Sequence, residues 1–199
     1  MTPQDVLAAR PDSRLARDAE ELVRVVAPPF LTNHSFRSHF FAVALAERDQ
    51  IRFDEELLYV ASLLHDIGLM EEFDTGRCFE EDGADAAVRL AAADGWPAER
   101  SEALAEAIRL HVAAKIALED GAEGFLLWHS TGLDVTGHRH GELDGRTVEA
   151  VLRAYPRLDF KEGFAGLVAD QAERKSGCWA DRAIAAGLRA RIEAAPFDS

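Results

Sequence analysis

The chain has 199 residues, of which 48% are hydrophobic, and its formal net charge is −14. A chain of this length can bury a sizeable core, and so strong a negative charge repels phosphate backbones, which argues against nucleic acid as a partner. No apolar run approaches membrane-spanning length, and no basic region followed by an apolar stretch opens the sequence, so we expect no membrane partner, no signal peptide and a cytoplasmic protein.

Residues typical of helix starts and ends recur in the first third of the chain. Neither this part nor the rest shows a convincing strand pattern. Ser13 is a suitable cap for a helix that ends before Pro28, and Thr32 or the residue after it can begin the next helix. Asp54 is a suitable cap for a third helix, whose apolar residues recur at helical spacing. We expect this third helix to end at Gly68, because glycine is common just after helix C-termini.

The middle of the chain predicts two further long helices and one short helix. Residues 84–94 form the fourth predicted helix. Pro97 can open a fifth, because proline suits the first helical turn. A brief apolar stretch over 125–128 predicts only a short buried helix.

Three more helices are expected toward the C-terminus. The first begins at Asp144 or three residues later and is closed by Pro156. Residues 159–162 resemble a capping box, so the second is expected to run from there toward Gly177. The last is Ala-rich and spans about 179–195. All these signals together predict an all-α fold.

The two cysteines, Cys78 and Cys178, form no CxxC pair and lie far apart in the sequence. Thiols stay reduced in the cytoplasm, where we expect this chain to be. We therefore expect both to be free thiols and neither to bind a metal.

The adjacent pair His65-Asp66 is the sharpest chemical feature of the sequence. It follows an apolar run over 60–64 and precedes Ile67-Gly68. A charged aspartate at the end of a buried helix is costly without a partner, and a helix C-terminus also disfavours negative charge. A divalent cation bound by the pair would remove both penalties. The alternative is a core histidine beside an aspartate paired with an arginine, which is the better interpretation for an isolated pair.

The pair belongs to an ordered set: His34, then His65-Asp66, then Asp134. This order resembles the HD-domain superfamily of metal-dependent phosphohydrolases, in which the pattern His, His-Asp, Asp lies on a helical bundle. Three flanking segments are similar to the family's motifs. They are NHSFR at 33–37, LLHDIG at 63–68 and LDV at 133–135. Within the superfamily, the His-Ser-x-Arg start, residues 79–84, and Asp134 followed by Gly137 look like the cyanamide hydratase branch.

The resemblance implies an HD-type helical bundle with the metal site inside it. It implies a single domain over residues 1–199, with a core of about 30–175 on which the N- and C-terminal helices pack. It also implies four metal ligands, which are His34, His65, Asp66 and Asp134. Two imidazoles and two carboxylates suit one divalent metal ion, for which we expect Zn first, with Fe, Mn or Co as alternatives.

The implied ion would lower the pKa of a bound water, so that a metal-bound hydroxide serves as the nucleophile near neutral pH. Asp66 is expected to orient this water as well as to bind the ion. His111 and His129 are candidates for proton transfer, because an imidazole titrates near neutral pH. Core histidines and ligands of a second metal are the alternatives for both.

Four residues are candidates for contacts with the substrate. Arg37 follows His34 by three positions, so both share a helix face, where Arg37 could bind an anionic substrate, steady a ligand carboxylate, or simply lie at the surface. Apolar residues near the motifs are candidates for the pocket wall, and each could equally be plain core. They are Phe36, Leu69 and Trp128, with Phe40, Leu64 and Phe79 as further candidates.

The sequence admits functions of three classes. The first is addition of water to a small, largely uncharged substrate of nitrile or amide type, favoured by the resemblance to cyanamide hydratases and the scarcity of Lys and Arg near the motifs. The second is hydrolysis of a nucleotide or other small phosphate ester, which needs cations to bind phosphate. The candidates are Arg37, with Arg77, Arg109 and Lys115 as further ones. The third, a non-catalytic binding module, has no need of four metal ligands. The expected partner is a small-molecule substrate, and the Ala-rich final helix leaves a homo-oligomer open.

Overall fold

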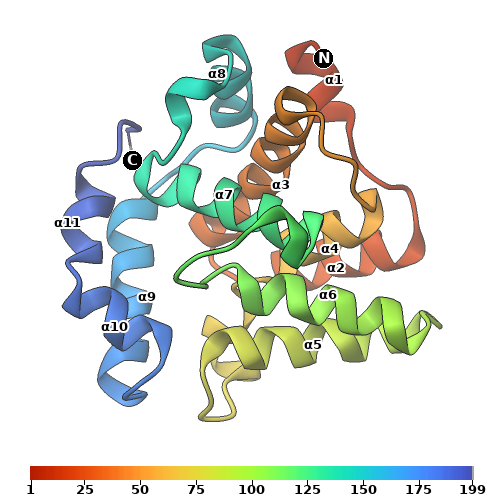
Figure 1. Cartoon of the computed structure of the whole chain (residues 1–199). Helices are drawn as coiled ribbons and strands as arrows, with labels where there is room; N and C mark the ends of the chain where they lie inside the picture. Colours follow the sequence, from red (N-terminus) through yellow and green to blue (C-terminus); the bar gives the residue numbers. More distant parts are fainter. Residues whose placement is uncertain (199) are drawn as a thin grey trace.

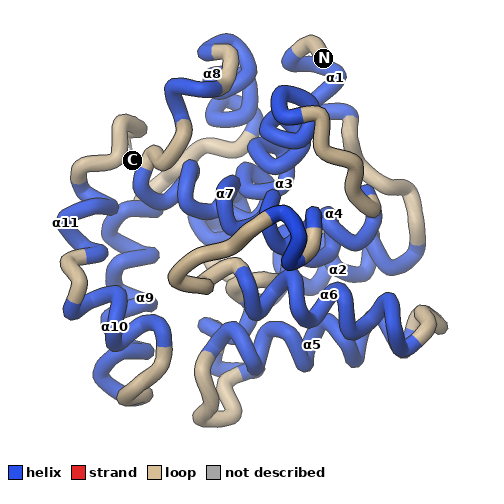
Figure 2. Tube along the Cα trace, viewed as in Figure 1, coloured by secondary structure: helices blue, strands red, loops and turns tan. Residues whose placement is uncertain are grey.

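The structure is a computed structural model that describes residues 1–198. Over these residues it contains only helices and their connections, and Figure 2 shows helical segments joined by loops without a strand. The prediction of an all-α fold is confirmed. None of the described helices is both long and apolar enough to cross a bilayer.

The helices follow one another with mostly short connections, as Figure 1 shows. The α-helices are α1 (Pro3–Ala8), α2 (Arg14–Val26), α3 (Pro29–Asp49), α4 (Glu55–Leu64), α5 (Phe79–Ala93), α6 (Ala98–Leu110), α7 (Ala122–Thr136), α8 (Gly145–Ala154), α9 (Phe160–Arg174), α10 (Trp179–Ala185) and α11 (Leu188–Glu193). Short 3-10 helices lie between some of them: η1 (Ile67–Leu69), η2 (Glu71–Phe73), η3 (Leu118–Asp120) and η4 (His140–Glu142).

The helix α3 lies at the centre of the fold. Nearly every side chain from Leu31 to Ala46 is buried, because α2, α4, α7, α8 and α9 pack around it. A helix covered on all sides is normally apolar all round, but α3 also buries His34, Arg37 and His39. Each of these polar side chains needs a partner inside the protein. The first two find a shared partner on α7.

Two groups of helices surround this centre. α5 and α6 pack as a pair along the lower part of Figure 1, and α9, α10 and α11 form a second group at its left. α7 packs on α3 and α6 and also contacts α11. Helices far apart in the sequence therefore meet near the middle of the molecule, and they carry the motif residues.

Most helix starts follow the cap residues that the sequence indicates. The side chains of Ser13, Asp54 and Asp144 accept hydrogen bonds from backbone N–H groups at the starts of α2, α4 and α8. α3 instead begins at Pro29, ahead of the predicted start, because proline has no N–H that needs a partner in the first turn. Asp159 precedes α9, but its side chain makes no cap hydrogen bond, so the predicted capping box is absent.

Four other boundaries differ from those expected. α5 begins at Phe79, five residues before the predicted start at residue 84. α4 ends at Leu64, before the His65-Asp66 pair, rather than at Gly68. α7 is a full-length helix where only a short one was predicted, because its buried stripe continues beyond the apolar run. The expected final helix is divided into α10 and α11 at Gly187, whose φ of 78° lies in the left-handed region that favours glycine.

Cys78 and Cys178 are joined by a disulfide bond, so the prediction of free thiols is wrong. Cys78 immediately precedes α5, and Cys178 immediately precedes α10. Sequence spacing carries no signal of this proximity, because it arises from the packing of α9 beside η1, which returns the chain to the start of α5. The bond ties the C-terminal helices to the segment that follows the His65-Asp66 pair.

Candidate metal centre

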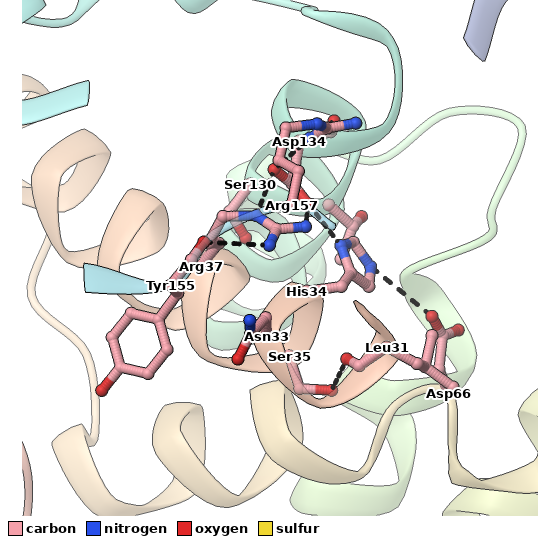
Figure 3. Close-up of polar contacts among 12 residues, drawn as sticks. Leu31, Asn33, His34, Ser35, Arg37, Asp66, Ser130, Asp134, Tyr155 and Arg157 are labelled. Carbon is pink, nitrogen blue, oxygen red and sulfur yellow. Dashed lines mark hydrogen bonds and ion pairs between the residues drawn. The ribbon is translucent and has the colours of Figure 1, made fainter. Parts of the chain in front are cut away.

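Three buried side chains converge where α3 meets the end of α4. His34 lies on α3, His65 follows the last residue of α4, and Asp66 begins the turn into η1. His34 Nε2 lies 3.2 Å from His65 Nε2 and 3.5 Å from Asp66 Oδ2. His65 Nε2 lies 3.2 Å from the same Asp66 oxygen. Figure 3 shows His34 directed at Asp66. Each of the three residues offers one donor atom, and these atoms all lie within 4.8 Å of one another.

The second nitrogen of each imidazole fixes where its proton lies. His34 Nδ1 lies 2.6 Å from Asp134 Oδ2, and His65 Nδ1 lies 2.8 Å from the backbone carbonyl oxygen of Ser62. Each of these oxygens accepts a hydrogen bond, so Nδ1 carries the proton and Nε2 of each neutral ring presents a lone pair. Two such lone pairs 3.2 Å apart beside a carboxylate form an arrangement that a metal ion between them would stabilise. Without the ion, burial lowers the pKa of His65 but the Asp66 charge raises it by more, so a proton on His65 balances the carboxylate instead.

The dimensions and the donor set fit a divalent metal ion. Ligand distances of about 2.0–2.2 Å place the donors of a tetrahedral zinc site about 3.3–3.5 Å apart. The observed separations of 3.2–3.5 Å agree with this spacing. Asp66 Oδ2 is also buried without a hydrogen-bond partner, which a bound cation would supply. Two imidazoles and one carboxylate suit Zn or another first-row ion and leave a position for water or substrate.

Asp134, the fourth expected ligand, lies on the Nδ1 side of the His34 ring, away from these three donors (Figure 3). Its Oδ2 also accepts a hydrogen bond from Arg37 Nη2 at 2.7 Å. Its Oδ1 accepts hydrogen bonds from Arg37 Nε at 2.8 Å and from Arg157 Nη1 at 2.7 Å. Burial alone would raise the pKa of Asp134. The Arg37 charge and the His34 hydrogen bond lower this pKa by more, so that it lies well below its usual range. In this arrangement Asp134 orients His34 and is not one of the clustered donors.

Arg37 and Arg157 together neutralise the buried Asp134 carboxylate. Arg37 is fully buried, and its Nη1 also donates to the backbone carbonyl oxygens of Tyr155 and Pro156. Arg157 comes from the connection between α8 and α9 and also donates to the Asp134 carbonyl oxygen at 2.8 Å. Arg37 therefore steadies a carboxylate and does not line the cavity, which corrects its assignment as a substrate contact. No motif marks Arg157, and the sequence analysis missed it.

His111 lies beside Asp66 at the end of α6. Its Nδ1 donates to the backbone carbonyl oxygen of Ile108, and its Nε2 lies 3.6 Å from Asp66 Oδ1. Its ring packs edge-on against that of His65, with 4.9 Å between centroids. Burial alone would raise the pKa of Asp66. The charge of His65 and the hydrogen bond from His111 lower this pKa by more, so the carboxylate stays ionised. His111 therefore directs a ring nitrogen toward the donors.

His129, the other candidate for proton transfer, does not reach this site. Its ring stacks on that of His138, with 5.5 Å between centroids. Burial, together with the charge of Arg139, lowers the pKa of His129 to about 4. The residues of α7 that line the cavity follow one helical stripe, on which His129 does not lie. They are Trp128, Thr131, Gly132, Val135 and Thr136.

The turn that carries His65 and Asp66 packs directly against the backbone of α5. A Cβ atom at Gly68 would lie 2.0 Å from the carbonyl oxygen of Phe79. A Cβ atom at Gly83 would lie 3.2 Å from the carbonyl oxygen of His65. Glycine at both positions allows this close approach, which holds the turn and its two donors against α5.

The three donors border a cavity of about 550 Å³. Several residues singled out from the sequence line it. They are His34, His65, Asp66, Phe79, His111 and Trp128. Phe36, Phe40, Leu64 and Leu69 do not line it. Phe36 is fully buried and stacks on Tyr155, and Leu69 is buried in the core, so the assignment of both as substrate contacts is corrected.

α9 and the helices after it supply walls that the sequence did not indicate. Phe160 stacks on the His34 ring with 4.8 Å between centroids, and the Phe164 ring lies 5.7 Å from it. Trp179 on α10 packs edge-on against Phe79 at 5.9 Å. Val112, Ala113 and Ala114 after α6 and His138 after α7 also line the cavity. A further part of the wall comes from α10, α11 and the connection between them. It contains Arg182, Ala183, Ala186, Leu188 and Arg191.

Comparison with known proteins agrees with this geometry. Residues 31–144 match the HD domain family. Two cyanamide hydratases of Saccharomyces cerevisiae, DDI2 and DDI3, are each 33% identical to the chain, over 83% of this chain and 76% of their own length. The matched segment contains all three clustered donors and Asp134. The chain therefore belongs to the HD-domain family and is a metal-dependent hydrolase or hydratase similar to the cyanamide hydratases.

Proposed function

We propose that this protein adds water to a small substrate of nitrile or amide type within the cavity beside the metal centre. The observation that carries the proposal is the convergence of His34 Nε2, His65 Nε2 and Asp66 Oδ2 at one edge of a partly open, largely apolar cavity. The relatives named cyanamide hydratases support the nitrile as the reacting group. The proposed partner is a small molecule, not nucleic acid or a membrane. The Cys78–Cys178 disulfide argues against the reducing cytoplasm that the sequence led us to expect, so the proposal includes no compartment.

The three donors would hold one divalent ion, with Zn as our first choice. Such an ion lowers the pKa of a water that it binds and so supplies a nucleophile near neutral pH. Asp134, fixed by Arg37 and Arg157, holds the proton of His34 on Nδ1 and keeps Nε2 available as a donor. A carboxylate in this position is a common partner of metal-binding histidines.

His111 is the proposed proton carrier. Its Nδ1–H is committed to the carbonyl oxygen of Ile108, so its Nε2 is the nitrogen that can take up a proton. This atom faces the cavity and lies 3.6 Å from Asp66 Oδ1. It is placed to accept the proton that the attacking water loses and to return it to the substrate nitrogen.

The alternative, hydrolysis of a small phosphate ester, needs cations beside the metal to bind phosphate. Arg37 is committed to Asp134, Arg77 pairs with Asp82, and Arg109 pairs with Glu81. None of these arginines lines the cavity, and neither does Lys115. The two arginines that do line the cavity, Arg182 and Arg191, come from α10 and α11 and not from the segments that carry the donors. The basic residues expected to bind phosphate beside the metal are thus absent from the described cavity wall, which supports the hydratase over the phosphohydrolase.

A direct test uses the protein with its metal content measured. Purified protein is assayed with cyanamide, a panel of aliphatic nitriles and amides, and a panel of nucleoside monophosphates. We expect hydration of at least one nitrile, or hydrolysis of at least one amide, and no activity in the His65→Ala variant, which loses the metal. Turnover of phosphate esters without turnover of any nitrile or amide would overturn the proposal in favour of the alternative.

A further inference from the structure

The cavity is large for the substrate that the relatives' name suggests. Cyanamide is among the smallest nitriles, whereas a volume of about 550 Å³ lies within the range of about 300–1000 Å³ that is typical of pockets for much larger ligands. The walls beyond the donors are mostly apolar, with Trp128, Phe164 and Trp179 among them. A substrate that fills this space has a body that extends well beyond its reacting group.

The charges that line the cavity are opposite in sign to those of the whole chain. The chain has 36 acidic residues and 22 lysines and arginines. Among residues 1–198, the cavity wall nevertheless contains a single carboxylate, that of Asp66, and two arginines, Arg182 and Arg191. Both arginines are exposed, whereas His34, His65 and Asp66 are buried. The negative group of the cavity therefore lies at its floor, and the two positive groups lie at its mouth, on α10 and α11.

The two guanidinium groups are available to a ligand. Among residues 1–198, no carboxylate lies within 4.0 Å of either group, and Arg182 donates only to the backbone carbonyl oxygen of Gly177. Arg189, on the same helix as Arg191, is different: it pairs with Glu193 at 3.7 Å and does not line the cavity. An arginine with free donors at the mouth of a pocket is well suited to bind a carboxylate or phosphate group.

We propose that the substrate carries an anionic group, which Arg182 and Arg191 bind at the mouth of the cavity while its reacting end lies beside His34, His65 and Asp66. This inference rests on the proposed function for the identity of the reacting end. The substrate class that follows is a nitrile or amide with a carboxylate, or another anion of similar size, at the opposite end of an apolar body.

The test compares an acid with its neutral counterpart. The probes are 4-cyanobutanoate and 4-cyanobutanamide, which share the nitrile and differ in charge at the other end. Binding to the metal-loaded protein is followed by quenching of Trp128 and Trp179, both of which line the cavity. We expect the carboxylate to bind about tenfold more tightly than the amide at low salt, the size of effect expected for a partly exposed charge-assisted contact. A phosphonate analogue of the acid shows which anion is preferred.

Two variants make the assignment specific. The double variant Arg182→Gln/Arg191→Gln should lose the preference for the carboxylate and retain its affinity for the amide. The Arg189→Gln variant is the matched control and should behave like the parent. Equal affinity of the parent for both probes, or an equal loss in Arg189→Gln, would overturn the inference.

The same samples separate this inference from the proposed function. Hydration of cyanamide without any preference for the carboxylate would leave the proposed function standing and refute the anionic substrate. A carboxylate preference that depends on Arg182 and Arg191, without turnover of any nitrile or amide, would retain the anion site and refute the proposed reaction.

Discussion

Two buried aspartates, Asp66 and Asp134, lie on either side of His34 and differ in what surrounds them. Asp134 has an arginine or histidine donor at each oxygen and two guanidinium groups to balance its charge. Asp66 has no arginine partner, and its Oδ2 faces two imidazole nitrogens without a hydrogen bond.

The difference assigns the two carboxylates to different tasks. A buried charge is stable when it is paired and hydrogen-bonded within the protein, and this describes Asp134. A buried charge that lacks such partners needs them from outside the chain, and this describes Asp66. One aspartate therefore completes the fold, and the other completes a metal site.

Replacement of Asp66 by asparagine is expected to have the largest effect on function. The variant should lose its bound metal and all turnover, because one of the three clustered donors loses its charge. The free energy of unfolding of the metal-free protein should fall less than for the same change at Asp134, because no buried arginine loses its counter-charge. Elemental analysis and urea unfolding measure the two quantities. Full metal occupancy in the variant would contradict the assignment.

His111→Ala tests whether the imidazole beside Asp66 Oδ1 carries the proton during turnover. Loss of a proton carrier lowers kcat by about 10²–10⁴-fold while the metal is retained, since His111 is not among the clustered donors. His129→Ala is the matched control, because this ring lies outside the cavity wall, and its kcat should equal that of the parent. Parent-like turnover in His111→Ala would move the proton transfer to another group.

Asp134→Asn is expected to affect stability first. It leaves Arg37 and Arg157 buried without a counter-charge, so the free energy of unfolding should fall by about 3–5 kcal/mol. Metal affinity should fall only about 10–100-fold, as for other carboxylates that orient a metal-binding histidine. Metal titration of folded protein separates the two roles. Complete loss of metal binding at unchanged stability would identify Asp134 as a ligand, the role that the family resemblance implies.

His39 is a buried histidine whose ring contacts a backbone carbonyl oxygen, whereas the ring of His34 contacts the carboxylate of Asp134. Its Nε2 lies 2.7 Å from the carbonyl oxygen of Ala9, and burial lowers the pKa of His39 to about 4. The unfolded chain takes up this proton near pH 6.5, so it binds more protons than the folded protein between these values. The free energy of unfolding should therefore fall as the pH falls from about 6.5 to 4, with a loss of about 2 kcal/mol at pH 5 relative to pH 8.

The variant His39→Gln isolates this contribution. Glutamine can donate to the same carbonyl oxygen without titrating, so its unfolding free energy should depend less on pH across this window. Urea unfolding of both proteins at pH 5, 6.5 and 8 gives the comparison. Identical pH dependence in the parent and the variant would show that His39 does not hold the assigned protonation state.

The sequence predicted the helices and the three donors because both depend on local patterns. Cap residues located the starts of α2, α4 and α8. The resemblance to the HD-domain motif implied four ligands, of which three, His34, His65 and Asp66, form the observed cluster and Asp134 does not. The direction of Phe36 could have been foreseen, since residues two positions apart on a helix, such as His34 and Phe36, lie on nearly opposite faces.

Other features depend on contacts between distant segments, which no local pattern encodes. Arg157 reaches Asp134 from a connection without a motif, and Phe160 covers His34 from a helix whose start was predicted without any link to the site. The mouth of the cavity depends on the division of the last helix at Gly187. The partner of Cys78 could not be inferred for the same reason.

The disulfide bond closes the backbone between Cys78 and Cys178 into a covalent ring. The connection between α6 and α7 belongs to this ring and contains the exposed residue Lys115. A single proteolytic cut after Lys115 would open the ring but leave both fragments linked, one carrying Asp66 and the other carrying Asp134. The two fragments would migrate as one species on a non-reducing gel and separate only on reduction. A nicked molecule can thus keep the two aspartates within one covalent assembly.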